Sequence, residues 1–184
     1  MRSKALHIIS ILLLTVGLVT TARAQSKIKI HGNVYGGGDQ AAVQGNTHVE
    51  INKGLYGGEI FGGGNGALNA DGSVNKSADI GSKYDGTDGV HTEGTLVEGT
   101  GTTDVTINGG KFIVEQESSG VESGKLTNNH NVFGGGKLGA VDGNTNVVFN
   151  SGQVNGNIYG GGKGEKGHLE KARVKGATNV TVGY

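Results

Sequence analysis

Three side chains, His48, Glu50 and Asp104, have the types and spacing that acid–base chemistry needs. His48 and Glu50 stand two positions apart, so in an extended strand they project from the same side. Asp104 occupies the position of His48 in the next copy of a repeated phrase. If the two copies stack in register, His48 and Asp104 become neighbours, and such a pair could act as acid and base on a polysaccharide.

A simpler interpretation of these residues is an exposed polar column. Ion pairs on a protein surface are common and contribute little to stability. The equivalent positions in the later copies are Asn146 and Asn179, which supply no further acid or base. We therefore favour the polar column, expect no catalytic residue, and expect that the protein is not an enzyme.

Metal-binding patterns are weak in this sequence. Residues 69–75 read Asn-Ala-Asp-Gly-Ser-Val-Asn, like the start of a calcium loop, but Ile80 stands where the loop needs its twelfth-position Glu. There is no cysteine, which excludes disulfides and thiolate ligands. Five histidines lie C-terminal to Ala24, without helical i, i+3 or i+4 grouping: His31, His48, His91, His130 and His168. We expect no metal and no cofactor.

Two repeated phrases must position all these side chains. An aliphatic-aromatic-triglycine phrase occurs four times, at residues 34–38, 60–64, 132–136 and 158–162. The spacing from Tyr35 to Phe61 equals that from Phe133 to Tyr159. A fixed period of this kind is typical of stacked repeat architectures, and its length is enough for three short strands.

The second phrase begins at Gly45, Gly101, Gly143 and Gly176. Within it Thr, Val and a third apolar residue alternate with mostly polar ones, the pattern of a strand with one buried and one wetted face. The two phrases together predict an all-β fold, a parallel β-helix or β-solenoid with about four rungs of about 26 residues. Irregular spacing places corner insertions near residues 65–100, 111–129 and 163–173.

The glycines of both phrases are expected to turn the corners of each rung, because glycine tolerates positive φ, and a side chain at Gly135 is also expected to collide with the rungs above and below. This applies to Gly54, Gly110 and Gly152 after the strand phrase and to the triglycines. The four aromatic residues of the first phrase share one offset, which favours an internal stack over a sugar-binding surface: Tyr35, Phe61, Phe133 and Tyr159.

The amino-terminal residues predict that the protein is exported, and the charge of the remaining chain bears on its partners. Residues 1–24 have a charged start, an apolar run and Ala22-Arg23-Ala24, the features of a cleaved signal peptide, so residues 25–184 form the single expected domain. Without the leader's three basic residues the 16 basic side chains become 13, against 16 acidic ones. The resulting net charge of about −3 gives no support for nucleic-acid binding, and no membrane span is expected in the mature chain.

The signal peptide and the two glycine-rich phrases resemble the β-solenoid repeats of secreted and surface proteins from Bacteroidetes-type bacteria, and more loosely the passenger domains of autotransporter adhesins. The resemblance covers about residues 27–184, outside the insertions. Such proteins are usually longer, and this chain ends at Val182-Gly183-Tyr184 within the strand phrase, which indicates a truncated member.

A regular scaffold with irregular insertions and no convergent catalytic cluster predicts an exported structural or adhesive module, secreted, periplasmic or at the cell surface, that binds a glycan or a protein. Its outward faces and its insertions are the expected binding regions. The alternatives are a polysaccharide-degrading lyase or hydrolase, and an inactive fragment of a larger surface protein. Because a short solenoid exposes sheet edges at both ends, end-to-end self-association is a further expectation.

Overall fold

The computed structural model describes residues 28–76, 78–81, 101–112 and 130–183 of the 184-residue chain. The expected signal peptide lies outside the described residues. So do residues 82–100 and 113–129, most of two of the expected insertions. Among the described residues, no helix has the length and apolar character needed to cross a membrane.

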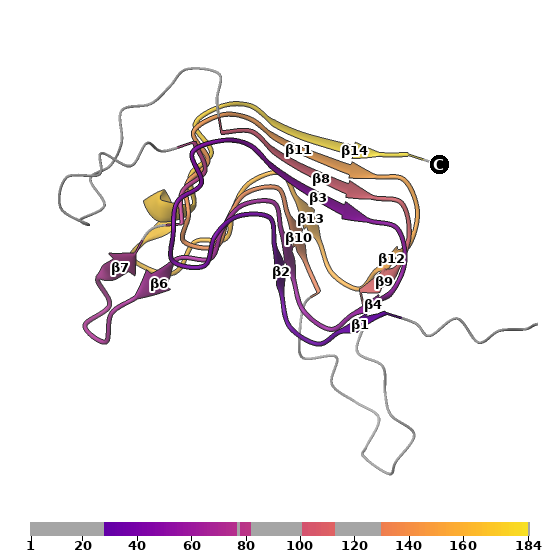
Figure 1. Ribbon diagram of the computed structural model, residues 1–184, viewed down its shortest axis with the longest axis horizontal. Coiled ribbons are helices and arrows are strands. Elements are labelled where there is room, and N and C mark those ends of the chain that lie inside the picture. Colours follow the sequence, from indigo (N-terminus) through magenta and orange to yellow (C-terminus); the bar gives the residue numbers. More distant parts are fainter. Residues whose placement is uncertain (1–27, 77, 82–100, 113–129, 184) are drawn as a thin grey trace, which may run out of the picture.

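Three parallel sheets of four strands each make up the fold, as Figure 1 shows. The first has the order β1-β4-β9-β12 and consists of β1 (Lys29–Ile30), β4 (Leu55–Tyr56), β9 (Lys111–Phe112) and β12 (Gln153–Val154). The second has the order β2-β5-β10-β13 and consists of β2 (Val34–Tyr35), β5 (Ile60–Phe61), β10 (Val132–Phe133) and β13 (Ile158–Tyr159). The third has the order β3-β8-β11-β14 and consists of β3 (Thr47–Ile51), β8 (Thr103–Ile107), β11 (Thr145–Phe149) and β14 (Thr178–Val182).

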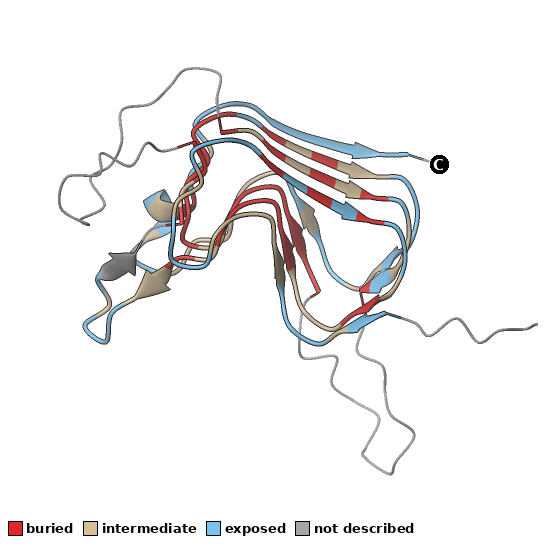
Figure 2. Cartoon of the chain, in the orientation of Figure 1, coloured by how far each residue is buried: buried red, intermediate tan, exposed pale blue. Residues whose placement is uncertain are grey.

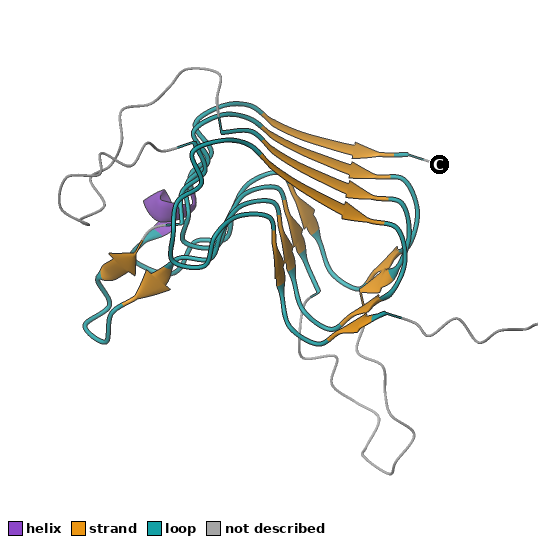
Figure 3. Ribbon diagram, viewed as in Figure 1, coloured by secondary structure: helices purple, strands orange, loops and turns teal. Residues whose placement is uncertain are grey.

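The chain visits the three sheets in the same order four times. We call each set of three strands a level: β1, β2 and β3 form level 1; β4, β5 and β8 level 2; β9, β10 and β11 level 3; β12, β13 and β14 level 4. Val34 pairs with Ile60, and Val132 with Ile158, each at the same place in the next copy of the phrase. The predicted all-β character and parallel pairing are confirmed. Among the described residues, the helical exception is a single 3-10 turn, η1 (Leu169–Ala172), in the third expected insertion (Figure 3).

The strand phrases stack in register because their alternation leaves only one face apolar. Thr47, Val49 and Ile51 pair with Thr103, Val105 and Ile107, and the same columns continue through the next two levels. In β3 the burial alternates between buried and exposed residues. The inward side chains pack with Ile60, Val132 and Phe112 into one apolar core. Figure 2 shows that core as the buried segments of the middle strands.

Two further columns of single parallel bridges follow the triglycines at every level. One runs through Asp39, Asn65, Lys137 and Lys163, and the other through Val43, Ile80, Val141 and Val174. Ile80, in the part of the first insertion that is described, is fully buried. The same insertion contains an antiparallel pair, β6 (Ala67–Leu68) and β7 (Val74–Lys76).

The glycines at the corners have two different physical roles. Gly54, Gly110 and Gly152 have φ values of 128°, 95° and 126°, as expected for a turn that only glycine makes easily. The prediction of positive φ for the triglycines is wrong, because none of their residues lies in that region. Their constraint is space: a Cβ on Gly135 would lie 2.8 Å from the backbone nitrogen of Gly162 in the next level.

Candidate functional site

The structure brings His48 opposite Asp104, as the repeat predicted, in the pairing of β3 with β8. The two do not form an acid–base pair. His48 Nε2 lies 3.9 Å from Glu50 Oε2 on its own strand, with side chains 58% and 49% exposed. The carboxylate of Asp104 accepts a hydrogen bond from Asn146 Nδ2 at 2.7 Å. This is the exposed polar column, and an ion pair so exposed and so long contributes little.

Asparagine amides extend this polar face across the β3-β8-β11-β14 sheet. Asn179 Nδ2 donates to Asn146 Oδ1 at 2.9 Å, one level beyond the bond to Asp104. A second column, at the ends of the strands, links Asn52, Asn108 and Asn150 by amide hydrogen bonds of 2.9 Å and 2.8 Å. Because each side chain holds the next one, the amide groups form an ordered surface with the spacing of the strands, about 4.8 Å. We call it the amide face.

The calcium-like segment forms the turn between β6 and β7. Asp71 Oδ1 accepts hydrogen bonds from the amide and the hydroxyl of Ser73, at 2.8 Å and 2.6 Å, and these bonds lower the pKa of Asp71. Asn69 Nδ2 donates to the same hydroxyl. The polar atoms therefore satisfy one another within a hairpin turn, and Ile80 is buried in the core rather than placed at the turn.

The histidines are dispersed over the structure. His31 and His48 are exposed, His168 is half-buried, and His91 lies outside the described residues. His130 is buried, and neither ring nitrogen has a hydrogen-bond partner. Within the described ranges, no three His, Cys, Asp or Glu side chains cluster closely enough to hold a metal ion.

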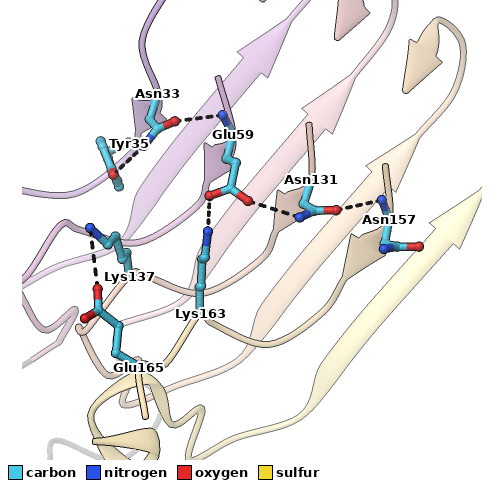
Figure 4. Close-up of polar contacts among 8 residues, drawn as sticks. All are labelled: Asn33, Tyr35, Glu59, Asn131, Lys137, Asn157, Lys163 and Glu165. Carbon is cyan, nitrogen blue, oxygen red and sulfur yellow. Dashed lines mark hydrogen bonds and ion pairs between the residues drawn. The ribbon is translucent and has the colours of Figure 1, made fainter. Parts of the chain in front are cut away.

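A second polar cluster, which sequence reasoning missed, lies beside the β2-β5-β10-β13 sheet and is drawn in Figure 4. Its centre is Glu59, whose side chain is only 14% exposed. Lys163 Nζ contacts Glu59 Oε2 at 2.5 Å, and Asn131 Nδ2 donates to Glu59 Oε1 at 3.0 Å. Both carboxylate oxygens are therefore engaged, which suits a structural ion pair better than a free general acid or base.

The same column of residues also binds main-chain amides from one level to the next. Asn33 Oδ1 accepts from the Glu59 amide at 2.8 Å, and Asn131 Oδ1 accepts from the Asn157 amide at 2.9 Å. These four residues precede the aliphatic-aromatic phrase at one fixed offset. Aligning the repeats would therefore have predicted the column, but not the ion pair, because Lys163 is 104 residues from Glu59.

Next to this cluster the four aromatic residues stack on one another. The ring centroids of Tyr35, Phe61, Phe133 and Tyr159 are 4.8, 4.9 and 4.9 Å apart, with interplanar angles of 15° or less. The predicted internal stack is confirmed: Phe61 is fully buried and Phe133 nearly so. Since each inner ring covers its neighbour's face, a sugar could stack only on the end rings. Burial, as the largest effect, raises the pKa of Tyr35.

Comparison of the chain with models of protein families, with curated proteins and with solved structures gave no match to any of them.

Proposed function

We propose that this protein is an exported β-solenoid that acts as a structural or adhesive module and binds an extended glycan on its amide face. The observation that carries the proposal is the in-register column of Asp104, Asn146 and Asn179, with its parallel column of asparagines. Export by the signal peptide, a place at the cell surface and membership of a Bacteroidetes-type family belong to the same proposal. They rest on the sequence features alone.

Periodicity favours a polymer as the ligand. Hydrogen-bonding groups recur on the amide face at the strand spacing of about 4.8 Å. An extended polysaccharide also repeats its hydroxyl groups along its length, so several weak contacts could act together on one chain. Amides and carboxylates supply both the donors and the acceptors that hydroxyl groups need.

The composition of the amide face favours a glycan over a protein partner. Protein interfaces generally have a buried apolar or aromatic centre. The outward positions of the four strands are His48, Glu50, Asp104, Thr106, Asn146, Val148, Asn179 and Thr181, and of these eight only Val148 is apolar. The rigid arrangement also reduces the entropy lost on binding.

Binding of the purified protein to a glycan array and to insoluble polysaccharides tests this proposal. We expect Asp104→Ala with Asn146→Ala to weaken binding about tenfold or more, since two adjacent polar contacts are lost. Lys53→Ala, at an exposed corner beside the same sheet, is the control and should bind normally. Arrays that are blank throughout, or a double variant that binds like the native protein, would refute it.

A polysaccharide-degrading enzyme is the second candidate, because β3 and β8 place His48 opposite Asp104. It predicts measurable turnover on a polysaccharide panel and its loss in His48→Ala and in Asp104→Ala. The hydrogen bond that occupies Asp104 and the exposure of His48 argue against it. A reducing-sugar assay measures product release. If the protein binds a polysaccharide but releases no product, the first proposal stands and the second is dismissed.

A further inference from the structure

The level 4 end of the molecule exposes side chains that are buried at the level beneath. All five residues of β14 are exposed, and Figure 2 shows this strand pale along its whole length. Val180 is 45% exposed, whereas Val147 directly beneath it is 1% exposed. Tyr159 is 43% exposed and Phe133 beneath it 6%. The core columns therefore continue to this end without a cover from the described residues.

At the level 4 end, the middle residue of the triglycine is glycine although no contact within the molecule excludes a side chain there. In levels 1 to 3 the middle glycine of each triglycine lies against the backbone of the next level. A Cβ on Gly37 would lie 2.7 Å from Gly64 N, and one on Gly135 would lie 2.8 Å from Gly162 N. The equivalent residue in level 4, Gly161, has nothing within 4 Å and is not at a positive φ.

The opposite end, at level 1, also has glycines that no contact within the molecule requires, although their equivalents in higher levels lie against the level below. A Cβ on Gly58 would lie 2.6 Å from Asn33 Oδ1 in the level below, whereas one on its level 1 equivalent, Gly32, meets nothing within 4 Å. A Cβ on Gly176 would lie 2.6 Å from Gly143 O, whereas Gly45 again meets nothing. Both ends thus have the glycines that a neighbouring level would need.

Hydrogen bonds and charge indicate what that neighbour is. Threonines of levels 1 to 3 each donate to the carbonyl of the first glycine of the triglycine one level above: Thr47 to Gly62, Thr103 to Gly134 and Thr145 to Gly160. Thr178, the fourth in this column, is exposed. In the bridge column that follows the triglycines, level 4 ends in the cation Lys163 and level 1 begins with the anion Asp39.

We propose that a second copy of this chain docks head to tail, with its level 1 on the level 4 of the first. Each of the three sheets then continues in parallel: β3 beside β14, β2 beside β13 and β1 beside β12. Thr178 Oγ1 donates to the Gly36 carbonyl of the second copy, and Asp39 of that copy lies above Lys163. This arrangement continues the register already present between levels and satisfies the open sheet edges. Because the two docking surfaces differ, the contact repeats, and the product is an open filament.

Sedimentation analysis over a protein concentration series is the first test. The proposal predicts a mean mass that rises continuously with concentration and does not stop at a dimer. Gly161→Val is designed to block the level 4 end and Gly45→Val the level 1 end, and a Cβ at either position meets nothing within 4 Å in its own molecule. Each variant alone should associate at least about tenfold more weakly than the native protein, with unchanged circular dichroism.

An equimolar mixture of the two variants provides the sharper test. Each retains one intact end, so the mixture should form a one-to-one pair and nothing larger. Thr106→Ala, on the lateral surface, is the control and should form filaments like the native protein. A native protein that stays monomeric at millimolar concentration, or filaments that persist in both glycine variants, would overturn the proposal. These outcomes are independent of glycan binding.

Discussion

Thr103 of β8 donates a hydrogen bond from Oγ1 to the main-chain oxygen of Gly134, 2.5 Å away, which follows β10 in the next level. Thr47 and Thr145 make the equivalent bond to Gly62 and Gly160. The buried threonine column therefore does more than fill the core, because it connects the strand phrase of one level to the triglycine phrase of the next.

Replacing Thr103 with Val should lower the free energy of unfolding by about 1–3 kcal/mol, since a buried carbonyl loses its donor while the volume stays nearly constant. Chemical denaturation measures this directly. Thr106→Val, on the outer side of the same strand, should change stability by no more than about 0.5 kcal/mol. Equal effects of the two substitutions would contradict the assigned bond.

Gly135→Ala should destabilise the protein by about 1–3 kcal/mol, because its methyl group would press on the backbone of Gly162. Gly161→Ala is the matched control, being the same position of the next copy with open space around it. Thermal melts at low protein concentration should show a lower Tm for the first and a native Tm for the second. If the two variants have the same Tm, close packing is not the reason for a glycine at position 135.

Lys163→Met should destabilise the protein because it leaves the largely buried carboxylate of Glu59 without its cation. Lys163 is itself 40% exposed, so solvent moderates the loss to about 1–2 kcal/mol. Glu59→Gln keeps an acceptor for Asn131 and serves in a double-mutant cycle. Strictly additive effects of the two substitutions would show that the pair has no coupling energy.

The turn at Asp71 should weaken in acid. Hydrogen bonds from Ser73 hold the pKa of Asp71 below its ordinary value of 3.8, so their contribution is present above that value and is lost as pH falls through the folded-state value. Ser73→Ala should raise the pKa of Asp71 towards 3.8, as followed by carbon NMR of the carboxyl group. Ser151→Ala, at a distant corner, should leave this titration unchanged.

At alkaline pH, ionisation of the partly buried phenol of Tyr35 should destabilise the fold. Burial raises the pKa of Tyr35 above its ordinary value of 10.0, so the neutral phenol contributes fully below that pH, and the contribution is lost as pH rises through the folded-state value. Tyr35→Phe should therefore lose less stability than the native protein between about pH 8 and about pH 11. Identical alkaline losses in the two sets of denaturation curves would show that this phenol does not control the effect.

The strand registers could be predicted from the sequence because alternation leaves no other solution. Shifting β8 by one residue would bury Asp104 and Thr106 and expose Val105. The stacking of Phe61 on Phe133 followed from the same logic, since a shared offset in the repeat becomes a shared position in space.

The remaining features depend on three-dimensional packing that no local pattern encodes. For the triglycines the expected collision between levels at Gly135 is confirmed, but the expected positive φ is not, because the local pattern does not fix the backbone conformation. Ile80 joins the core from inside an expected insertion, where no repeat marks it. The contact of Glu59 with Lys163 joins two copies of the triglycine phrase that are two levels apart, so the pattern within one copy does not predict it.

The chain segments that lead from one level to the next, here called excursions, differ greatly in length. The hydrogen bond from Asn131 to Glu59 closes a separation of 72 residues, whereas that from the Glu59 amide to Asn33 closes one of 26 residues. Loop-closure entropy grows only with the logarithm of length, so the longer excursion costs the folding chain about 0.9 kcal/mol more. That is less than one good buried hydrogen bond. A lineage carrying this architecture can therefore lengthen such an excursion, and vary what it displays, with almost no loss of thermodynamic stability and only slower folding.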